Sequence, residues 1–358
     1  MNIKQIAKAA GVSVATVSRV LNHPDSVAPA TREKIQKVMD EEEYTPNWFA
    51  RGLNFNSTKT IGLVIPHTIN SNYMEIANGV EEVARQKGYI TFMCNMEKDP
   101  QMEKEYIDQL VKRKVDGLIL MFTNLDDEYM NWIRNEKIPT VLIGGGKVIQ
   151  EWDSVNVDCR AGAAEMVAHL VECGHETVGI LCGDNPETEM QDMLLGYKNV
   201  LKASGKKVRE ELIRCVENNI EGGYLGMKKM IAESTGEEGI NVQKLPDVIF
   251  ATSDEIAYGA IDAIKDSGLK IPEDIAIAGF GNNRMSNLME PKLTTVEQPF
   301  RKMGIYGARI LFDLIEENAD RKNKKRTGGK SDRRHIILQT KMRVRKSCGN
   351  KGRIGEMF

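Results

Sequence analysis

The chain has few of the residues from which metal clusters and disulfide frameworks are built. Its 358 residues include six cysteines and five histidines. The cysteines are widely spread without a C-x-x-C pair, and the histidines form no H-E-x-x-H or other ligand cluster. In a chain of this length, such cysteines are typical of reduced core residues. We therefore expect no metal site and no cofactor.

Long apolar runs are also absent. No stretch approaches the ~20 apolar residues that span a bilayer, and the N-terminus lacks an apolar run of signal-peptide length. These absences predict a soluble cytoplasmic protein with no membrane partner. The 41% hydrophobic content is still ample for large cores, and 358 residues exceed what one core usually organises. We expect two or three domains.

The formal net charge is only −2, but it is unevenly distributed. Residues 1–32 carry Lys4, Lys8, Arg19 and Arg32 against Asp25 alone. A locally basic segment is the electrostatic footprint of a nucleic-acid-binding module. The N-terminal end of the chain is therefore the expected DNA-facing end.

Two short helices around a glycine turn occupy this basic end. Residues 3–10 and 14–22 both repeat apolar side chains at helical spacing, and Gly11 between them allows a left-handed turn. Ser13 stands at the N-cap position, where its hydroxyl accepts from the backbone N–H near Thr16. The second helix buries Val17, Val20 and Leu21 and presents Val14, Ala15, Ser18, Arg19 and Asn22 on its other face. This pattern predicts a helix-turn-helix that reads the DNA major groove.

A third helix at residues 31–40 completes the predicted headpiece. Pro29 stands at its N1 position, and Ala28 occupies the place of a capping hydroxyl. Pro46 then breaks the helix. Residues 47–53 are too few for a stable isolated helix, so we expect a conditional helix there.

From residue 59 onward, apolar strands alternate with amphipathic helices. The expected strands are 60–65, 89–94, 117–122 and 140–143 in one set, and 177–182, 212–216, 247–251 and 274–279 in another. The expected helices are 73–87, 101–113, 160–173, 190–204, 222–233, 255–267 and 300–317. This alternation predicts parallel sheets with helices on both faces.

The two sets of strands echo one another. Residues 59–63 resemble 176–180, and residues 115–119 resemble 246–250. Two similar lobes predict a cleft between strand ends, which is the usual ligand site in open α/β architecture. The predicted fold class is thus α/β, with an all-α headpiece and a two-lobed core.

The C-terminal region is strongly basic. Residues 321–346 hold twelve Lys and Arg against Asp332 alone, which favours a solvated, flexible loop over a second nucleic-acid contact. Residues 335–339 are suited to close the sheet as a last strand. A disordered tail is expected from Ser347.

The sequence resembles the lactose-repressor/galactose-repressor (LacI/GalR) family of bacterial transcription regulators from residue 2 to residue 345. Ordered matches lie at residues 11–22, 31–34, 44–47, 50–53, 115–117, 174–175, 253–257, 271–274 and 291–299. The resemblance implies a headpiece at 1–46, a hinge helix and linker at 47–58, a periplasmic-binding-protein-like core at 59–346 and a tail at 347–358. Within that core we expect lobe 1 at 59–157 and 288–319, and lobe 2 at 158–287 and 333–346.

The resemblance also implies partners and contact residues. A homodimer, or a tetramer, would bind a pseudo-palindromic operator in double-stranded DNA under the control of a small-molecule effector. By position, the DNA contacts would be Ser13, Val14, Ala15, Thr16, Ser18, Arg19 and Asn22, together with Asn47, Ala50, Arg51 and Leu53 of the hinge. Leu53 would be the wedge that enters the minor groove.

The effector cleft departs from the pattern of the sugar-responsive members. Gln191 replaces the arginine that usually stands five residues before the Gly-Tyr pair, and Asn282 replaces the carboxylate of the Gly-Phe-Asp motif. The cleft candidates lie at strand ends or in the loops after them: His67, Tyr73, Asp158, Gln191, Ser253 and Asn282. A sugar held differently, a sugar phosphate, another phosphate or purine ligand, and a protein corepressor all remain open.

An enzyme and a solute-binding receptor are the alternative classes. Residues 144–147 resemble a phosphate loop and residues 279–281 a dinucleotide turn, but neither has the full spacing, and no G-x-S-x-G elbow occurs. No catalytic residues are therefore expected. The headpiece and the missing export signal argue against a receptor. The sequence predicts a DNA-binding regulator, and a repressor rather than an activator.

Overall fold

The computed structural model describes residues 2–22, 24–42, 44, 57–97, 99–145, 151–183, 187–236, 239–324 and 332–349. The chain divides into two compact units, Met1–Lys59 and Thr60–Phe358. The expected hinge segment, residues 47–58, lies outside the described residues except for Ser57 and Thr58. Residues 325–331, in the central part of the basic segment, also lie outside the described residues.

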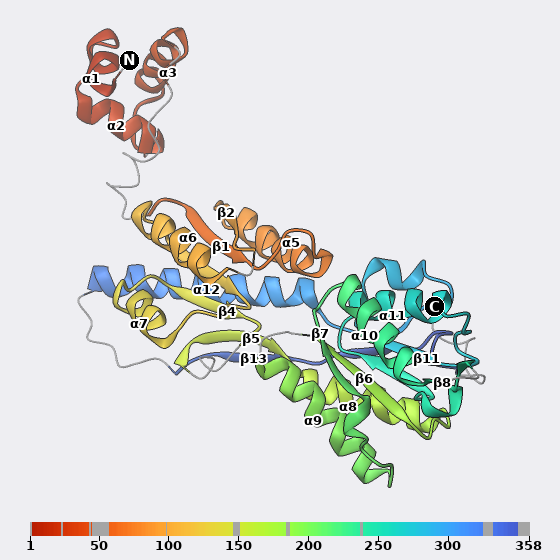
Figure 1. The fold of residues 1–358 in the computed structure, drawn as a ribbon. Coiled ribbons are helices and arrows are strands. Elements are labelled where there is room, and N and C mark those ends of the chain that lie inside the picture. Colours follow the sequence, from red (N-terminus) through yellow and green to blue (C-terminus); the bar gives the residue numbers. More distant parts are fainter. Residues whose placement is uncertain are drawn as a thin grey trace. The chain divides into compact units, whose positions relative to one another are not determined.

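In its described residues, the first unit contains the three-helix headpiece that the sequence predicts (Figure 1). It contains α1 (Ile3–Ala9), α2 (Val14–Asn22), a 3-10 turn (Pro24–Ser26) and α3 (Pro29–Glu41). Gly11 turns the chain between α1 and α2 with a φ of 64°. All three helices contribute to the core, which comprises Ile6, Ala7, Ala10, Val17, Val20, Ile35 and Met39. The third helix starts at Pro29, which confirms the predicted N1 position of this proline.

Side-chain caps set the starts of α1 and α2 in the headpiece. The Ser13 hydroxyl accepts from the N–H of Thr16 at 3.0 Å, which confirms the predicted N-cap. Ala28 gives α3 no side-chain cap, as expected. Asn2 and Gln5 form a reciprocal capping box on α1 that the sequence analysis did not identify.

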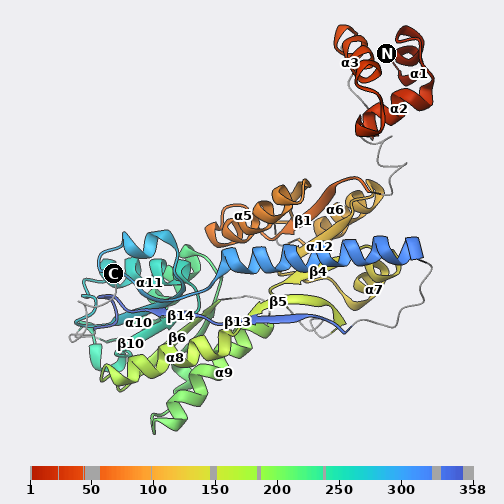
Figure 2. The same ribbon diagram turned by 180° about the vertical axis from the view of Figure 1, so that it is seen from behind.

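The second unit contains, within its described residues, two six-stranded sheets (Figures 1 and 2). The first sheet has the order β13-β5-β4-β3-β1-β2 and is parallel throughout. Its strands are β1 (Thr60–Ile65), β2 (Ile90–Asn95), β3 (Gly117–Met121), β4 (Thr140–Ile143), β5 (Asp153–Val157) and β13 (His335–Leu338). Helices α5 (Ser71–Gln86) and α12 (Phe300–Lys324) cover one face, and α6 (Pro100–Lys112) and α7 (Asp127–Asn135) cover the other. This sheet and its helices form lobe 1.

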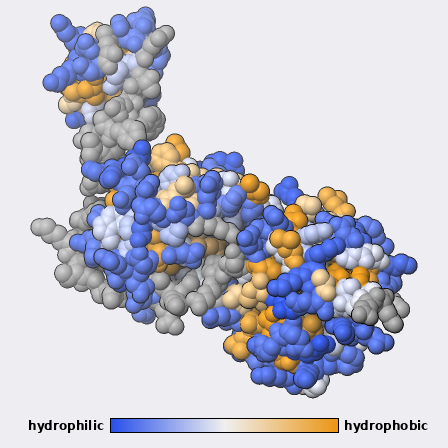
Figure 3. Space-filling view, in the orientation of Figure 1, coloured by the Kyte–Doolittle hydropathy of each residue, from blue (hydrophilic) through white to orange (hydrophobic). Residues whose placement is uncertain are grey.

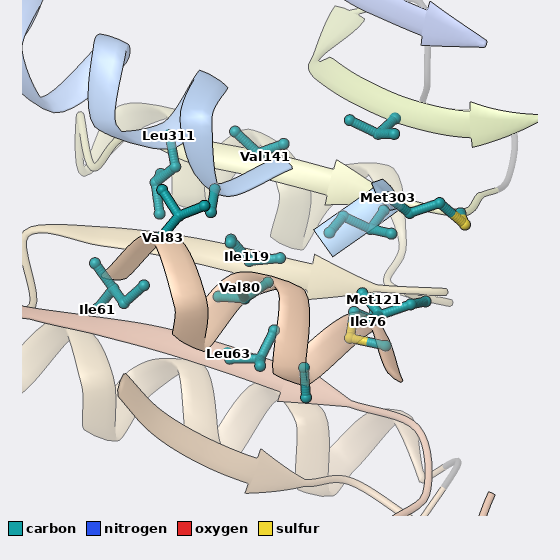
Figure 4. Packing of buried hydrophobic residues seen from close by; sticks show 14 of the residues in the cluster. Ile61, Leu63, Ile76, Val80, Val83, Ile119, Met121, Val141, Met303 and Leu311 are labelled. Carbon is teal, nitrogen blue, oxygen red and sulfur yellow. The ribbon is translucent and has the colours of Figure 1, made fainter. Parts of the chain in front are cut away.

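Apolar side chains fill the space between the first sheet and helices α5 and α12. Figure 4 shows Ile61, Leu63, Ile119, Met121 and Val141 of the strands facing Ile76, Val80 and Val83 of α5 and Met303 and Leu311 of α12. Because helices cover both faces, the central strands are buried on both sides and are almost wholly apolar. That property made these strands recognisable in the sequence.

The second sheet forms lobe 2 and has the order β14-β12-β11-β10-β6-β7. Its strands are β6 (Val178–Gly183), β7 (Ile213–Val216), β10 (Val248–Ala251), β11 (Ala276–Gly281), β12 (Thr294–Glu297) and β14 (Lys341–Arg343), of which β14 runs antiparallel to β12. Helices α8 (Cys159–Glu172) and α9 (Glu187–Ala203) cover one face, and α10 (Ile220–Glu233) and α11 (Asp254–Asp266) cover the other. A short hairpin of β8 (Thr235–Gly236) and β9 (Gly239–Ile240) follows α10.

Two expected segments are each divided between the lobes. Residues 288–319 are expected in lobe 1, and α12 packs there, but β12 pairs with β11 in lobe 2. Residues 333–346 are expected in lobe 2, and β14 pairs with β12 there, but β13 pairs with β5 in lobe 1. The prediction is wrong for β12 because this strand is short and polar. Its buried Thr294 and Thr295 carry hydrogen-bonded hydroxyl groups, which do not form an apolar run.

The residues after β14 are packed, whereas a disordered tail is expected from Ser347. Ser347 and Cys348 have no exposed surface. The Ser347 hydroxyl donates to the carbonyl of Ile277 at 2.6 Å and accepts from the N–H of Thr294 at 2.8 Å. The tail prediction is therefore wrong at its start, because these hydrogen bonds attach the segment to β11 and β12.

A glycine allows α10 and α11 to approach closely. A Cβ placed on Gly259 of α11 would overlap the carbonyl oxygen of Ile220 at the start of α10. A side chain at this position would force the two helices apart. None of the helices in the described part of the chain is long and apolar enough to cross a membrane.

Candidate functional site

The outer face of α2 carries the predicted DNA-contact side chains of the headpiece. Ser13, Ala15 and Arg19 are exposed, and Val14 has 40% of its surface accessible. Thr16 and Ser18 are half-buried at the edge of this face. Val17 and Val20 point into the headpiece core. The helix thus presents small side chains at its start and one long cation a turn later, an arrangement that fits a major groove.

Some predicted DNA contacts are not described by the structure. Asn22 ends α2, but its side chain lies outside the described residues, as do Asn47, Ala50, Arg51 and Leu53. At the start of α2, the Ser13 hydroxyl lies 2.8 Å from the Thr16 hydroxyl. This contact orders two hydroxyls side by side where a phosphate would meet the helix N-terminus.

Two of the predicted cleft residues are helix caps. Asp158 accepts from the N–H of Ala161 at 2.8 Å and caps α8. Ser253 accepts from the N–H of Ile256 at 3.3 Å and caps α11. The Ser253 hydroxyl also donates to the side-chain oxygen of Asn218 at 2.5 Å. Both residues therefore hold the helix starts that face the other lobe.

Tyr73 lies against an aromatic side chain that the sequence analysis did not select. Its ring centroid is 5.1 Å from that of Phe122, which follows β3. A Cβ placed on Gly144, which follows β4, would overlap the Phe122 ring. The carboxyl ends of β3 and β4 thus support an aromatic pair on the lobe 1 side of the cleft.

His67 and Gln191 are less well placed to contact a ligand between the lobes. The Nδ1 atom of His67 accepts from the N–H of Ile69 at 3.2 Å, which fixes the loop after β1. Gln191 is exposed on α9. Neither residue lines the groove described below.

Glu189 is a cleft residue that the sequence analysis missed. Its carboxylate accepts a hydrogen bond from the backbone N–H of Gly145, so it joins α9 of lobe 2 to the loop after β4 of lobe 1. Burial raises the pKa of this carboxyl to about 7, against the opposing effect of the Gly145 hydrogen bond. The contact between Glu189 and Gly145 forms only where the two lobes meet, so the local sequence around Glu189 does not identify it.

Asn282 lies in a loop that a buried carboxylate holds in place. It has a φ of 56°, a conformation that asparagine tolerates well. Asp254 accepts from the N–H of Asn283 at 2.7 Å, from the Ser286 hydroxyl at 2.7 Å and from the Thr295 hydroxyl at 2.5 Å. Burial raises the pKa of Asp254, whereas these three donors lower it. The carboxylate therefore positions the loop instead of capping α11.

A groove of about 850 Å³ runs between the lobes within the second unit. Residues of α5, the loop after β11, the connection from β12 to α12 and the connection from β13 to β14 line it. Asn282 lines it, and the other five cleft candidates do not. Its charged lining comprises Arg284, Arg301, Lys302, Lys341 and Arg343 against Glu75 and Glu297. Arg284, Arg301 and Arg343 are paired with Glu75, Glu82 and Glu297. The remaining excess of positive charge comes from Lys302 and Lys341, and it suits an anionic ligand.

One ion pair within the groove joins the two lobes, and a second lies within lobe 2. Arg284 of lobe 2 lies 3.3 Å from Glu75 of α5 in lobe 1. Arg343 pairs with Glu297 beside the crossing strands. Movement of one lobe against the other would change the Arg284–Glu75 distance, so a ligand in the groove could favour one arrangement of the lobes.

Comparison with known proteins agrees with this anatomy. A model of bacterial regulatory proteins of the lacI family matches residues 2–47, and a model of periplasmic binding protein-like domains matches residues 167–348. Catabolite control protein A of Staphylococcus xylosus is 33% identical over 324 residues, which are 90% of this chain and 95% of that protein. The HTH-type transcriptional repressor PurR of Actinobacillus pleuropneumoniae is 32% identical over 88% of this chain and 91% of its own length.

The fold is also that of a solved repressor. The lac repressor dimer bound to operator and the anti-inducer ONPF superposes with a TM-score of 0.80 at 24% identity, over 97% of this chain and 99% of that chain. These relatives are transcriptional regulators and not enzymes, as the sequence predicts. The chain therefore belongs to the lacI family of bacterial DNA-binding transcriptional regulators.

Proposed function

We propose that this protein represses transcription as a homodimer whose two headpieces bind the half-sites of a pseudo-palindromic operator. The exposed face of α2 is the observation that carries the proposal. Val14 and Ala15 contact base edges or thymine methyl groups, and Arg19 reads a base. The hydroxyls of Ser13, Thr16 and Ser18 and the amide of Asn22 hold phosphates or neighbouring bases.

The hinge at residues 47–58 forms the second part of the DNA contact. Paired Leu53 side chains enter the minor groove at the operator centre, supported by Asn47, Ala50 and Arg51. The headpiece covers residues 1–46 and the effector-binding core residues 59–346. A Leu53→Ala substitution should therefore weaken operator binding, and an unchanged affinity would remove the hinge from the proposal.

Exposed apolar side chains of lobe 2 support the homodimer. Ile220 and Leu225 of α10 have 45% and 58% of their surface accessible, and Met285 and Leu288 after β11 have 49% and 83%. Figure 3 shows hydrophobic residues gathered on lobe 2 among hydrophilic ones. Ile220 and Leu225 share one helix, and exposed apolar side chains of this size are typical of a protein–protein interface.

The effector is a small anionic molecule, such as a sugar phosphate, bound between the lobes. The groove volume of about 850 Å³ suits a ligand of that size. Its cationic lining provides the countercharge, and Asn282 and Asn283 provide amide groups for hydroxyls. By favouring one arrangement of the lobes, the effector shifts the dimer between DNA-bound and DNA-free forms.

Binding to genomic DNA tests the proposal. The full-length protein is incubated with genomic fragments and random competitor at moderate ionic strength, and the retained fragments are sequenced. Sugars, sugar phosphates, nucleosides and nucleotides are screened in parallel for a rise in melting temperature. Enrichment of fragments that share a palindromic site, changed by a stabilising sugar phosphate, is the expected result. Equal retention of all fragments would rule the proposal out.

A further inference from the structure

Three potential metal ligands meet at the end of α8 in lobe 2. His169 and Cys173 are four residues apart, so they share one face of the last helical turn. Cys348 reaches the same point from the C-terminal segment. The Nε2 atom of His169 lies 3.5 Å from the sulfur of Cys173 and 3.5 Å from the sulfur of Cys348. All three ligand atoms lie within 4.8 Å of one another.

The two nitrogen–sulfur separations match a tetrahedral zinc site. With Zn–S and Zn–N bonds of ~2.3 Å and ~2.0 Å, a tetrahedral angle places sulfur and nitrogen ligands ~3.5 Å apart. Two thiolates and an imidazole are ligands that zinc prefers, whereas calcium and magnesium require oxygen. Two of the ligands are shielded from solvent, since Cys348 has no exposed surface and His169 has 8%, and Cys173 is half-buried.

We propose that His169, Cys173 and Cys348 bind one Zn²⁺ ion, with water or an exchangeable ligand in the fourth position. On binding, each thiol releases its proton to solvent and ligates as a thiolate. His169 and Cys173 come from the end of α8 in lobe 2, and Cys348 comes from the segment after β14. The ion therefore attaches the C-terminal segment of the chain to α8.

The surroundings support the ligands. Gly174, with a φ of 93°, turns the chain after Cys173 and returns His175 toward the cluster. The Nε2 atom of His175 donates to the carbonyl of Cys348 at 2.9 Å. This hydrogen bond fixes the backbone of a ligand, as second partners at metal sites commonly do.

The proposed ion is connected to the inter-lobe groove through the same C-terminal segment. Ser347, next to Cys348, is hydrogen-bonded to β11 and β12. Arg345, three residues earlier, donates to the side chain of Asn282, which lines the groove. Zinc binding should therefore stabilise the packed position of this segment and raise the melting temperature of the protein.

The test is a metal titration of the reduced, chelator-treated full-length protein. Zn²⁺ is titrated in competition with a chromophoric chelator, and Co²⁺ is added separately to record thiolate charge-transfer bands. Wild type should bind one equivalent of Zn²⁺ tightly, with a rise in melting temperature. The Co²⁺ form should have the spectrum of a tetrahedral site with sulfur ligands.

Matched variants locate the ion. Cys348→Ser and Cys173→Ser should each lose the charge-transfer band in part and weaken Zn²⁺ binding by at least roughly a hundredfold. His175→Gln should weaken it by roughly tenfold. Cys215→Ser, at an exposed thiol on β7, is the control and should bind Zn²⁺ like wild type.

Three outcomes would overturn the proposal. The first is wild-type protein that binds no equivalent of Zn²⁺. The second is bound Zn²⁺ that is unaffected by Cys348→Ser in a variant with a wild-type circular dichroism spectrum. The third is a Cys173–Cys348 disulfide that re-forms in air and, once reduced, gives thiols that take up no metal. The first outcome is measured on wild-type protein alone. The test therefore stays decisive even if a variant fails to fold.

Discussion

The guanidinium group of Arg345 donates a 2.7 Å hydrogen bond to the side-chain oxygen of Asn282. Its other terminal nitrogen donates to the carbonyl of Leu293 at 2.5 Å. These bonds join the segment after β14 to the loop after β11, where Asn282 faces the inter-lobe groove. Asp254 lies near the same guanidinium and adds an electrostatic attraction.

Replacing Arg345 by methionine should destabilise the protein by about 2 kcal/mol, because charge-assisted hydrogen bonds are lost and their acceptors stay shielded from water. Chemical denaturation of the full-length protein measures the change. Lys346→Met, at the exposed neighbouring position, is the control and should leave the unfolding free energy within about 0.5 kcal/mol. Equal stability of the two variants would contradict the role of Arg345.

Glu103 makes the stability of the protein depend on pH. This residue of α6 has 1% of its surface exposed, and burial raises the pKa of its carboxyl from 4.5 to about 7. Hydrogen bonds from the Thr123 hydroxyl and the Asn124 N–H only partly oppose the shift. Between these two pH values the folded protein holds a proton that the unfolded chain has released, so stability falls as pH rises.

Glu103→Gln should remove this contribution. The unfolding free energy of wild type should fall by more than that of the variant between pH 5 and pH 8, by on the order of 2–3 kcal/mol. Glu105→Gln, on the exposed face of the same helix, should retain the wild-type dependence. Parallel pH profiles for all three proteins would show that the carboxyl of Glu103 does not titrate in this range.

Leu225 tests the proposed homodimer interface. An aspartate at this exposed apolar position of α10 would place an unpaired charge in the interface. Leu225→Asp should raise the dimer dissociation constant by roughly 30-fold or more in sedimentation experiments. Leu195→Asp places the same charge on α9, where the side chain is 42% exposed, and should sediment like wild type. If Leu195→Asp weakened the dimer and Leu225→Asp did not, the interface would lie on α9.

Gly259 tests the close approach of α10 and α11. Gly259→Ala should cost about 1–3 kcal/mol of unfolding free energy, because the new methyl group overlaps the backbone of Ile220. A Cβ on Gly236 meets no atom of the described residues within 4 Å. Gly236→Ala should therefore be close to neutral. A stabilised Gly259→Ala variant would mean that the helices can separate without loss.

Local patterns in the sequence predict the headpiece and the central strands well. The N-cap at Ser13 and the turn at Gly11 are both confirmed. Each could be predicted because it depends only on residues that are close in the sequence. Helix α7 and strand β5 were missed, because their apolar positions are few and interrupted by charged or polar side chains. The lobe assignment fails at β12, where buried hydroxyls replace apolar side chains.

Contacts between residues that are far apart in the sequence could not be predicted from local patterns. Glu189 meets Gly145 only because the two lobes come together. Phe122 covers Gly144 through the packing of neighbouring strand ends. The His169 and Cys173 pair has helical spacing that the sequence does show, but its partner Cys348 is far along the chain. Short ligand motifs in the sequence therefore do not reveal the cluster.

Base-specific DNA recognition by Arg19 is the most direct test of the account. Binding of the full-length protein to its best genomic fragment and to random DNA is compared for wild type, Arg19→Ala and Lys37→Ala, an exposed position on α3 paired with Glu41. Arg19→Ala should reduce the preference for the genomic fragment by roughly 5–150-fold, the loss expected for a base contact. Lys37→Ala should keep the wild-type preference. An unchanged preference in Arg19→Ala would contradict the assignment of α2 as the helix that reads the operator.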